Sequence, residues 1–356
     1  MKNKKRKIKK LIICAAAAVM LASCGEAVGS SSQPRLSSDS LSSAAEEIST
    51  VIGTAASETL QTTAAAVTTT TTTTTTAAAT STTTTATSAP APKEAEITDP
   101  YCKSAMIMCA EDKSVVFSFN TDAQVSLASI TKLLTACTML KYLSPEAVVT
   151  VGNEIYLAKP ESTLAYLIPG TTLSLSELIS AMLLPSGNDA AYTAAVTTAR
   201  AMMPGANLTD YEAVDTFVVL MNGLAEDLGM TNSHFANPEG WDDPGNYTTA
   251  EDLMKLVEYA WSLSTVRETV SQYQKTVYYP QGGYSVWTNT NKLLTPGGYF
   301  YDADFIGIKT GTTANAGSCL VSAYKRGAKT YFCIVMGCSY DDDRYILTKK
   351  LMQEIE

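Results

Sequence analysis

The stretch Ser129–Leu140, SITKLLTACTML, joins a chemical motif to a helical pattern. Apolar residues recur along it at helical spacing: Leu133, Ala136, Cys137 and Leu140. This spacing predicts a helix that buries one side against a core. Ser129 lies at the amino end of the helix, where unpaired backbone amides favour the negative charge of an attacking alkoxide. The amine of Lys132 lies one turn away on the same face, so it can take the hydroxyl proton of Ser129.

Two more short motifs follow in the chain: Ser186-Gly187-Asn188 and Lys309-Thr310-Gly311-Thr312. A capping box of Ser174 and Glu177 starts a helix that Pro185 ends, so the first of these motifs lies in a turn between helices. Alternation over residues 305–310 places the second in a strand with one apolar side, from which Lys309 points into the site. Taken singly, the three motifs are an ordinary helix end, turn and strand end. In this order they indicate a serine-acylation site.

The rest of residues 99–356 predicts a mixed fold of helices and strands. The expected strands are a hairpin, Ser104–Met108 with Val115–Phe119, and a later pair, Ala316–Ala323 with Thr330–Gly337. Three further helices are expected. One runs from Thr209 or Asp210 to Gly229, one begins at a cap formed by Thr248 and Glu251, and one runs from Asp343 to Ile355. The last helix is expected to pack through Ile346, Leu347, Met352 and Ile355.

The amino terminus has the pattern of an export signal. Seven basic residues among the first ten precede an apolar run from Leu11 to Leu21. This run is too short to span a bilayer comfortably but suits a secretory signal. It ends in Leu21-Ala22-Ser23-Cys24-Gly25, which resembles a bacterial lipobox. We therefore expect residues 1–24 to be a lipoprotein signal peptide, with a lipid on Cys24 as the membrane anchor. The alternative is an ordinary signal cleaved near small residues.

Residues 25–98 are almost wholly alanine, serine and threonine, with a few acids and an unbroken threonine run at 68–76. This composition cannot build a core, so a disordered linker is expected. A flexible coil of this length spans about 50 Å. The remaining residues, 99–356, are enough for one core and predict a single catalytic domain with a helical subregion.

Charge and cysteine content argue against several partners. The formal net charge is −9, and removing residues 1–24 takes away seven basic groups and no acidic group, which leaves −16. A nucleic-acid partner is therefore not expected. Six of the eight cysteines fall in the domain without a C-x-x-C pair, and the one histidine, His234, is expected in a turn or on the surface, so no metal site is predicted. The six cysteines either pair as disulfides or remain buried thiols.

The domain closely resembles the serine D-alanyl-D-alanine carboxypeptidases, the low-molecular-mass penicillin-binding proteins of peptidase family S11. The resemblance covers about Ser104 to Glu356. It rests on the surroundings of the motifs as well: SLASITK at 126–132, LPSGNDAA at 184–191, FANPEG at 235–240, NTNKLL at 289–294 and GIKTGTT at 307–313. It implies an α/β (mixed α+β) fold of the β-lactamase/transpeptidase type. In this fold a five-stranded antiparallel sheet is flanked by helices, and the site lies between the sheet and a helical region.

The resemblance also implies a role for each motif residue. Ser129 is the acylated nucleophile and Lys132 its general base, while Ser186 relays protons. Lys309 binds the substrate carboxylate, and its charge lowers the pKa of Lys132 by like-charge repulsion. The implied substrate-binding residues are Asn188, Lys309, Thr310, Gly311 and Thr312.

The finer contacts follow from the same resemblance. Asn188 holds the peptide backbone, and the hydroxyls of Thr310 and Thr312 add contacts. Gly311 lets the substrate approach the strand closely. The backbone amides of Ser129 and Thr312 form the oxyanion hole.

The implied activity is removal of the terminal D-alanine from peptidoglycan stem pentapeptides through a Ser129 acyl-enzyme. No cofactor is implied, and β-lactam antibiotics are implied as covalent inhibitors. The lipid on Cys24 is expected to hold the protein on the outer face of the bacterial membrane.

Two departures from the family pattern stand out. Asn246 occupies a position where many relatives carry histidine. The chain also stops shortly after the last predicted helix, without the carboxy-terminal β-domain and amphipathic anchor of many relatives, so attachment is expected to fall to Cys24.

Two alternative functions remain open. A class A β-lactamase carries the same three motifs but adds a glutamate that activates water. Glu226 follows the second motif at a suitable distance, yet its place in a helix predicts an exposed acid. A penicillin-binding sensor or wall-binding module that is acylated without turnover would carry intact motifs as well.

Overall fold

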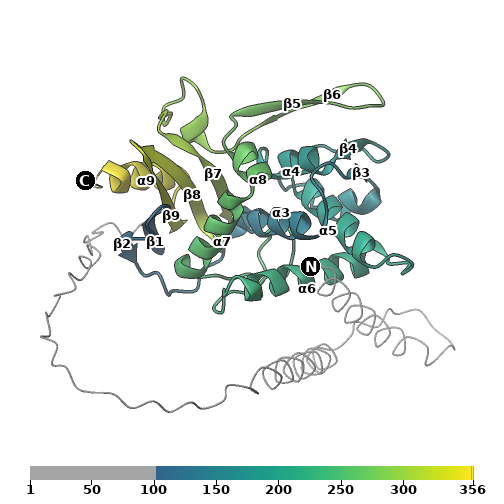
Figure 1. The fold of residues 1–356 in the computed structure, drawn as a ribbon, viewed down its shortest axis with the longest axis horizontal. Helices are drawn as coiled ribbons and strands as arrows, with labels where there is room; N and C mark the ends of the chain where they lie inside the picture. The colour runs from purple at the N-terminus through teal and green to yellow at the C-terminus, as the bar shows by residue number, and fades with distance from the viewer. Residues whose placement is uncertain (1–101, 354, 356) are drawn as a thin grey trace, which may run out of the picture. The chain divides into compact units, whose positions relative to one another are not determined.

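The computed structural model describes residues 102–353 and residue 355. Five strands form an antiparallel sheet in the order β2-β1-β9-β8-β7 (Figure 1). They are β1 Ser104–Cys109, β2 Val115–Phe119, β7 Phe305–Thr313, β8 Gly317–Arg326 and β9 Lys329–Cys338. The predicted hairpin and the three later strands are therefore confirmed. The predicted signal peptide with Cys24 and the predicted linker at 25–98 lie outside the described residues.

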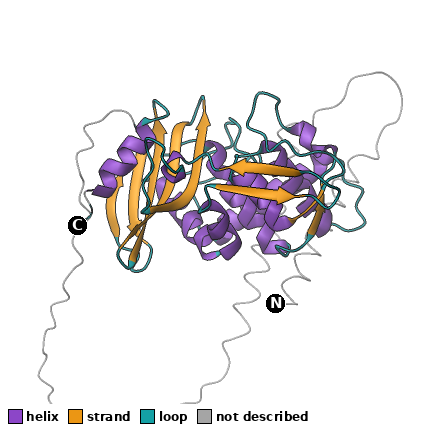
Figure 2. Ribbon diagram, turned by 90° about the horizontal axis from the view of Figure 1, so that it is seen from above, coloured by secondary structure: helices purple, strands orange, loops and turns teal. Residues whose placement is uncertain are grey.

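Side chains of the sheet alternate between two apolar clusters, one on each face. Met106 and Met108 of β1 point toward the larger helical region, whereas Ile107 points toward α9, Asp343–Gln353. Figure 2 shows the sheet between α9 and the other helices. The last helix packs through Leu347, Met352 and the following Ile355, as predicted. The expectation for Ile346 was wrong: it is 56% exposed, because the helix turns Tyr345 and Leu351 toward the sheet instead.

The helical region surrounds one central helix, α3. Its elements are α3 Thr131–Tyr142, α4 Leu175–Leu183, α5 Asn188–Met202, α6 Asp210–Asp227, α7 Ala250–Ser262 and α8 Ser264–Val270, with 3-10 turns η1 Ala128–Ile130, η2 Asn153–Leu157 and η3 Lys292–Leu294. The sequence predicted one buried side for α3, but all residues from Thr131 to Met139 are buried because neighbouring helices pack around it. Two of its buried hydroxyls bond to backbone carbonyls, while that of Thr131 has no partner among the described residues. The hydroxyl of Thr135 donates to the Pro238 carbonyl at 2.6 Å.

Helix caps follow the sequence signals in two cases out of three. Ser174 and Glu177 form the predicted capping box of α4, and Thr209 caps α6. The predicted cap of α7 was one residue early: Thr249 is the cap and accepts from the amide of Asp252 at 3.2 Å. Thr248 is held instead by an antiparallel bridge to Val125, so its backbone is already committed before the helix begins.

Two small sheets complete the domain: β3 Val148–Thr150 with β4 Thr172–Ser174, and β5 Gln274–Tyr278 with β6 Tyr284–Thr288. Within residues 102–353 all six cysteines are buried and free of disulfides. Of the two predicted alternatives, disulfides or buried thiols, the structure has the buried thiols. Over the described part of the chain, no helix has the length and apolarity needed to cross a membrane.

Candidate active site

The turn that carries Ser129 is short and directly precedes α3. Ser129 lies in η1, and its Oγ is 2.8 Å from the Nζ of Lys132, one turn along the chain. The amine of Lys132 also donates to the backbone carbonyl of Glu239 at 2.7 Å. The structure thus brings the predicted nucleophile and its predicted base into hydrogen-bond contact, and a carbonyl from a distant loop fixes the amine.

Two glycines let the backbone close around this turn. A Cβ on Gly311 of β7 would lie 2.7 Å from the Leu127 carbonyl oxygen and 3.1 Å from the amide nitrogen of Ser129. A Cβ on Gly240, whose φ is +86°, would overlap the Ala128 carbonyl. The missing side chain of Gly311 thus makes room for the turn of Ser129. The close approach of substrate to this strand stays a prediction.

Burial sets the protonation of Lys132. Its side chain has no solvent exposure, and this desolvation lowers the pKa of its amine to about 7. The negative charges of Glu239 and Asp189 oppose the shift and favour the ammonium form. An amine with a pKa near neutrality can both take and return a proton, which suits a general base next to Ser129.

Lys309 is also fully inside the protein, at 1% exposure, and its Nζ donates to the Thr310 carbonyl at 3.0 Å. Burial first, and then the charges of Lys132 and Arg344, lower the pKa of Lys309 well below its usual value. The two lysines are thus close enough to interact. The predicted lowering of the Lys132 pKa is confirmed, but its main cause is burial. The like-charge repulsion instead lowers the pKa of Lys309.

The second motif lies in the turn before α5, which packs against α3. Ser186 adopts a left-handed backbone with φ of +64°, an uncommon conformation for a residue with a side chain. The Oγ of Ser186 and the Oδ1 of Asn188 are buried without a hydrogen-bond partner among the described residues. Groups of this kind are rare in folded proteins and mark places where a ligand or water completes the bonding.

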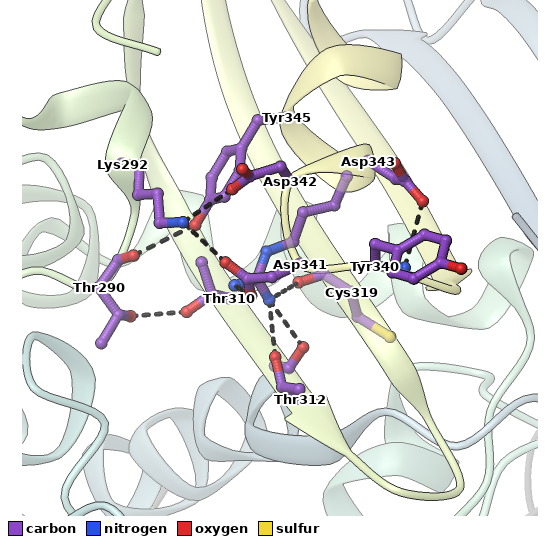
Figure 3. Close-up of polar contacts among 12 residues, drawn as sticks. Thr290, Lys292, Thr310, Thr312, Cys319, Tyr340, Asp341, Asp342, Asp343 and Tyr345 are labelled. Atoms are coloured by element: carbon purple, nitrogen blue, oxygen red, sulfur yellow. Dashed lines mark hydrogen bonds and ion pairs between the residues drawn. The ribbon is translucent and has the colours of Figure 1, made fainter. Parts of the chain in front are cut away.

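The hydroxyls of the third motif are used within the protein (Figure 3). Thr310 shares a 2.6 Å hydrogen bond with Thr290, and Thr312 accepts from the guanidinium of Arg344 at 2.9 Å. Arg344 also donates to the Gly311 carbonyl at 3.0 Å and pairs with Asp341. These bonds hold the strand in place. A contact between either threonine and a substrate stays a prediction.

Sequence reasoning missed two buried charged residues of this site. Arg344 follows three aspartates and gave no sign that it would turn back to β7. Glu239 is 4% exposed, and its Oε1 accepts from the phenol of Tyr192 at 2.9 Å. The only available signal was the FANPEG string at 235–240, which indicated the family but not the position of the carboxylate.

The other sequence predictions near the site concern Asn246, His234 and Glu226. Asn246, at the position of a histidine in many relatives, is buried and ties the loop together, accepting from the Ala236 amide at 2.7 Å and donating to the Trp241 carbonyl at 2.8 Å. His234 is exposed, as predicted, and bonds to the Gly245 carbonyl. Glu226 is exposed on α6, also as predicted.

Comparisons with known proteins agree with this arrangement. The sequence is 28% identical over 277 residues to the D-alanyl-D-alanine carboxypeptidase DacC of Escherichia coli K12, covering 75% of this chain and 64% of DacC. It is 32% identical over 232 residues to the D-alanyl-D-alanine carboxypeptidase of Streptomyces sp. K15, covering 63% of this chain and 76% of that protein. The chain therefore spans somewhat less than two thirds of the E. coli relative.

Solved structures show the same fold. The Streptomyces K15 DD-transpeptidase is 30% identical with a TM-score of 0.64, over 71% of this chain and 96% of that one. Penicillin-binding protein D2 of Listeria monocytogenes, in its ampicillin-bound form, is 29% identical with a TM-score of 0.56 and the same coverage. Residues 86–339 match the profile of Peptidase_S11, described as D-alanyl-D-alanine carboxypeptidase. With more than half of its length matched, this chain belongs to the Peptidase_S11 family of D-alanyl-D-alanine carboxypeptidases.

Proposed function

We propose that this protein removes the terminal D-alanine from peptidoglycan stem pentapeptides and that β-lactam antibiotics acylate the same serine. One observation carries the proposal: a lysine amine with a pKa lowered to about 7 lies 2.8 Å from the Ser129 hydroxyl. Such a pair can generate an alkoxide at neutral pH without a metal or an imidazole.

The proposed reaction proceeds through an acyl-enzyme that forms and is then hydrolysed. Lys132 takes the proton of Ser129, and the Oγ attacks the carbonyl carbon of the penultimate D-alanine. The bond to the nitrogen of the terminal D-alanine breaks, and that nitrogen receives a proton relayed through Ser186. Water then gives a proton to Lys132 and attacks the ester carbonyl. The bond to Oγ breaks, Oγ takes the proton back from Lys132, and the shortened peptide leaves with a new carboxyl group. Lys309 receives the substrate carboxylate, and backbone amides of Ser129 and Thr312 stabilise the oxyanion.

The cell-surface setting is part of the proposal. The basic and apolar amino terminus and the lipobox-like string at 21–25 support export and a lipid on Cys24. A linker at 25–98 would then let the domain work at a distance of tens of ångströms from the outer face of the membrane. Mass spectrometry of the mature protein isolated from membranes tests this directly, because a lipidated Cys24 gives a defined amino-terminal mass.

The activity is tested by D-alanine release from diacetyl-L-Lys-D-Ala-D-Ala, with penicillin-treated protein and Ser129→Ala as controls. We expect release by the wild-type chain and loss in both controls. Labelling of Ser129 by penicillin without D-alanine release would contradict the carboxypeptidase and favour a penicillin-binding sensor. Rapid penicillin hydrolysis in the same preparation would favour a β-lactamase.

A second candidate is peptide transfer, because the structural relative from Streptomyces K15 is named a DD-transpeptidase. The acyl-enzyme is the same, and only the acceptor differs: an amine replaces water. Adding glycine as an acceptor to the release assay separates the two, since transfer produces a new peptide bond whose product has a different mass from the hydrolysed tetrapeptide analogue.

A further inference from the structure

The carboxylate of Glu239 is unusual because one of its oxygens has no partner. Oε1 accepts from Tyr192 of α5, while Oε2 is fully buried without a hydrogen bond among the described residues. Burial raises the pKa of Glu239, and the charge of Lys132 and the Tyr192 bond counteract this effect. A buried carboxylate left half-bonded is costly, and the backbone carbonyl of the same residue accepts from the reacting amine of Lys132 at 2.7 Å, so Glu239 calls for a functional reason.

The charged groups around Lys132 single out Glu239. Asp189 of α5 is the other nearby carboxylate, but it is occupied by the backbone amides of Ala165 and Leu167, at 2.8 Å and 2.9 Å. Lys309 of β7 is the nearby cation, and the charges of Lys132 and of Arg344 of α9 both act on it.

Glu239 itself faces few charges. Among the described residues, the groups that favour its ionised form are the ammonium of Lys132, the phenol of Tyr192, its own backbone amide and the ammonium of Lys159. Lys159 lies over the ring of Trp241 at 4.2 Å and is exposed. Of the two carboxylates that act on Lys132 within the described part of the chain, Glu239 is therefore the one that retains a free oxygen.

We propose that Glu239 is a positioning residue that acts through Lys132: its buried carboxylate stabilises the ammonium group that forms when Lys132 takes the proton of Ser129. An ammonium formed in a desolvated site is unfavourable unless an opposite charge lies close by. Glu239 takes no proton from the substrate in this role. Its backbone carbonyl holds the amine in place, and its side chain supplies the charge.

The inference rests on the proposed function, because it assumes that Ser129 is acylated. The test is the second-order rate of acylation by a fluorescent penicillin, measured on the full chain from about pH 5 to pH 9. In the wild type the rate should rise with pH through about 7, as Lys132 loses its proton. No labelling of the wild type at any pH would overturn the proposed function and the Glu239 inference with it, whereas normal labelling of the wild type with an unchanged midpoint in Glu239→Gln would overturn the inference alone.

Glu239→Gln removes the charge but keeps the backbone carbonyl and a group that accepts from Tyr192. Without the carboxylate, the ammonium form is less favoured, so the pKa of Lys132 falls. The midpoint of the rate profile should move to lower pH by about one unit. Because a weaker base transfers the proton less readily, the plateau rate should fall about 10-fold.

Three further variants keep the test decisive. Glu239→Asp keeps the charge and should hold the midpoint within about 0.3 unit of the wild type. Tyr192→Phe removes the bond that favours the ionised carboxylate, so the midpoint should shift the same way as in Glu239→Gln but by less. Glu154→Gln is the matched control. Glu154 is 3% exposed, accepts from the Gly152 amide at 2.8 Å and has no bond to Lys132 among the described residues, so its profile should not change.

An unchanged midpoint in Glu239→Gln, with normal folding, would overturn the inference. If Glu239→Gln fails to fold, the midpoint in Tyr192→Phe decides in its place. A purely structural role for Glu239 would lower the rate at every pH by one factor and leave the midpoint where it is.

Discussion

The turn of Ser129 and the turn of Ser186 use their polar groups in opposite ways. The hydroxyl of Ser129 is bonded to Lys132, whose amine is fixed by the Glu239 carbonyl. The hydroxyl of Ser186 and the amide oxygen of Asn188 are buried with no partner within the described residues. In the assembled half, the turn of Ser129, the reacting hydroxyl and amine are therefore bonded by the protein itself. The open half, the turn of Ser186, leaves its bonding capacity for a ligand or water.

This difference assigns proton transfer to the turn of Ser129 and substrate recognition to the turn of Ser186. Proton transfer requires donor and acceptor to be in hydrogen-bond contact, and Ser129 and Lys132 are already in contact at 2.8 Å without substrate. On the other side, Ser186 has a strained backbone with φ of +64°. Its hydroxyl and the amide oxygen of Asn188 can accept hydrogen bonds from a ligand or water. Substitutions on the two sides should accordingly have different effects on activity and on stability.

Ser129→Ala should give the largest effect, because it removes the only group in the assembled half that forms a covalent bond. D-alanine release and covalent penicillin labelling should both fall by about 1,000-fold or more. The folded state should be little affected, since only one half-buried hydroxyl is lost. Labelling that persists in this variant, followed to its peptide by mass spectrometry, would place the nucleophile elsewhere and undo the comparison.

Gly240→Ala should show how tightly the assembled half is packed. The added Cβ would overlap the Ala128 carbonyl and would sit at a φ of +86°, so the free energy of unfolding should fall by about 3 kcal/mol or more. Gly229→Ala is the control, because its φ of +73° carries the same backbone cost with no atom within 4 Å. It should lose only about 1 kcal/mol. Equal losses in urea unfolding would show that Gly240 matters for its backbone angle alone.

The sequence predicted the local parts of the site well. The Ser-x-x-Lys spacing, the capping box of Ser174 and the strand around Lys309 all depend on residues within a few positions of one another, and all three appear in the structure. Periodicity reports only which neighbours along a helix share a face. It could not show that α3 is surrounded on every side, because the surrounding helices come from distant segments.

What the sequence could not provide are the long-range partners. Glu239 meets Lys132 across 107 positions, and Arg344 reaches Gly311 across 33. Neither contact has a local signature, since a glutamate in a loop and an arginine in a helix are usually solvated. The cap of α7 moved from Thr248 to Thr249 for a similar reason: a tertiary bridge to Val125 decided it.

Lys309→Met tests recognition at the edge of the assembled half. It keeps most of the side-chain volume and removes the amine, so kcat/KM for peptides with a free carboxylate should fall about 100-fold, and that for an amidated peptide should change little. In the wild type, the lowered pKa of Lys309 means that carboxylate binding takes up a proton, so KM should rise with pH. Equal losses on both peptides would remove Lys309 from carboxylate binding.

Ser186→Ala should have the smallest effect on stability and gives the sharpest test of the open half. A buried hydroxyl without a partner costs free energy, so its removal should leave the free energy of unfolding unchanged or raise it by about 1 kcal/mol, even though activity falls. Ser180→Ala is the matched control, because the Ser180 hydroxyl donates to the Ser176 carbonyl at 2.9 Å and accepts from Lys275. That variant should lose about 1 kcal/mol. If urea unfolding instead shows Ser186→Ala to be as destabilised as Ser180→Ala, the Ser186 hydroxyl is bonded in the free protein, by water for example, and both turns are assembled before substrate binds.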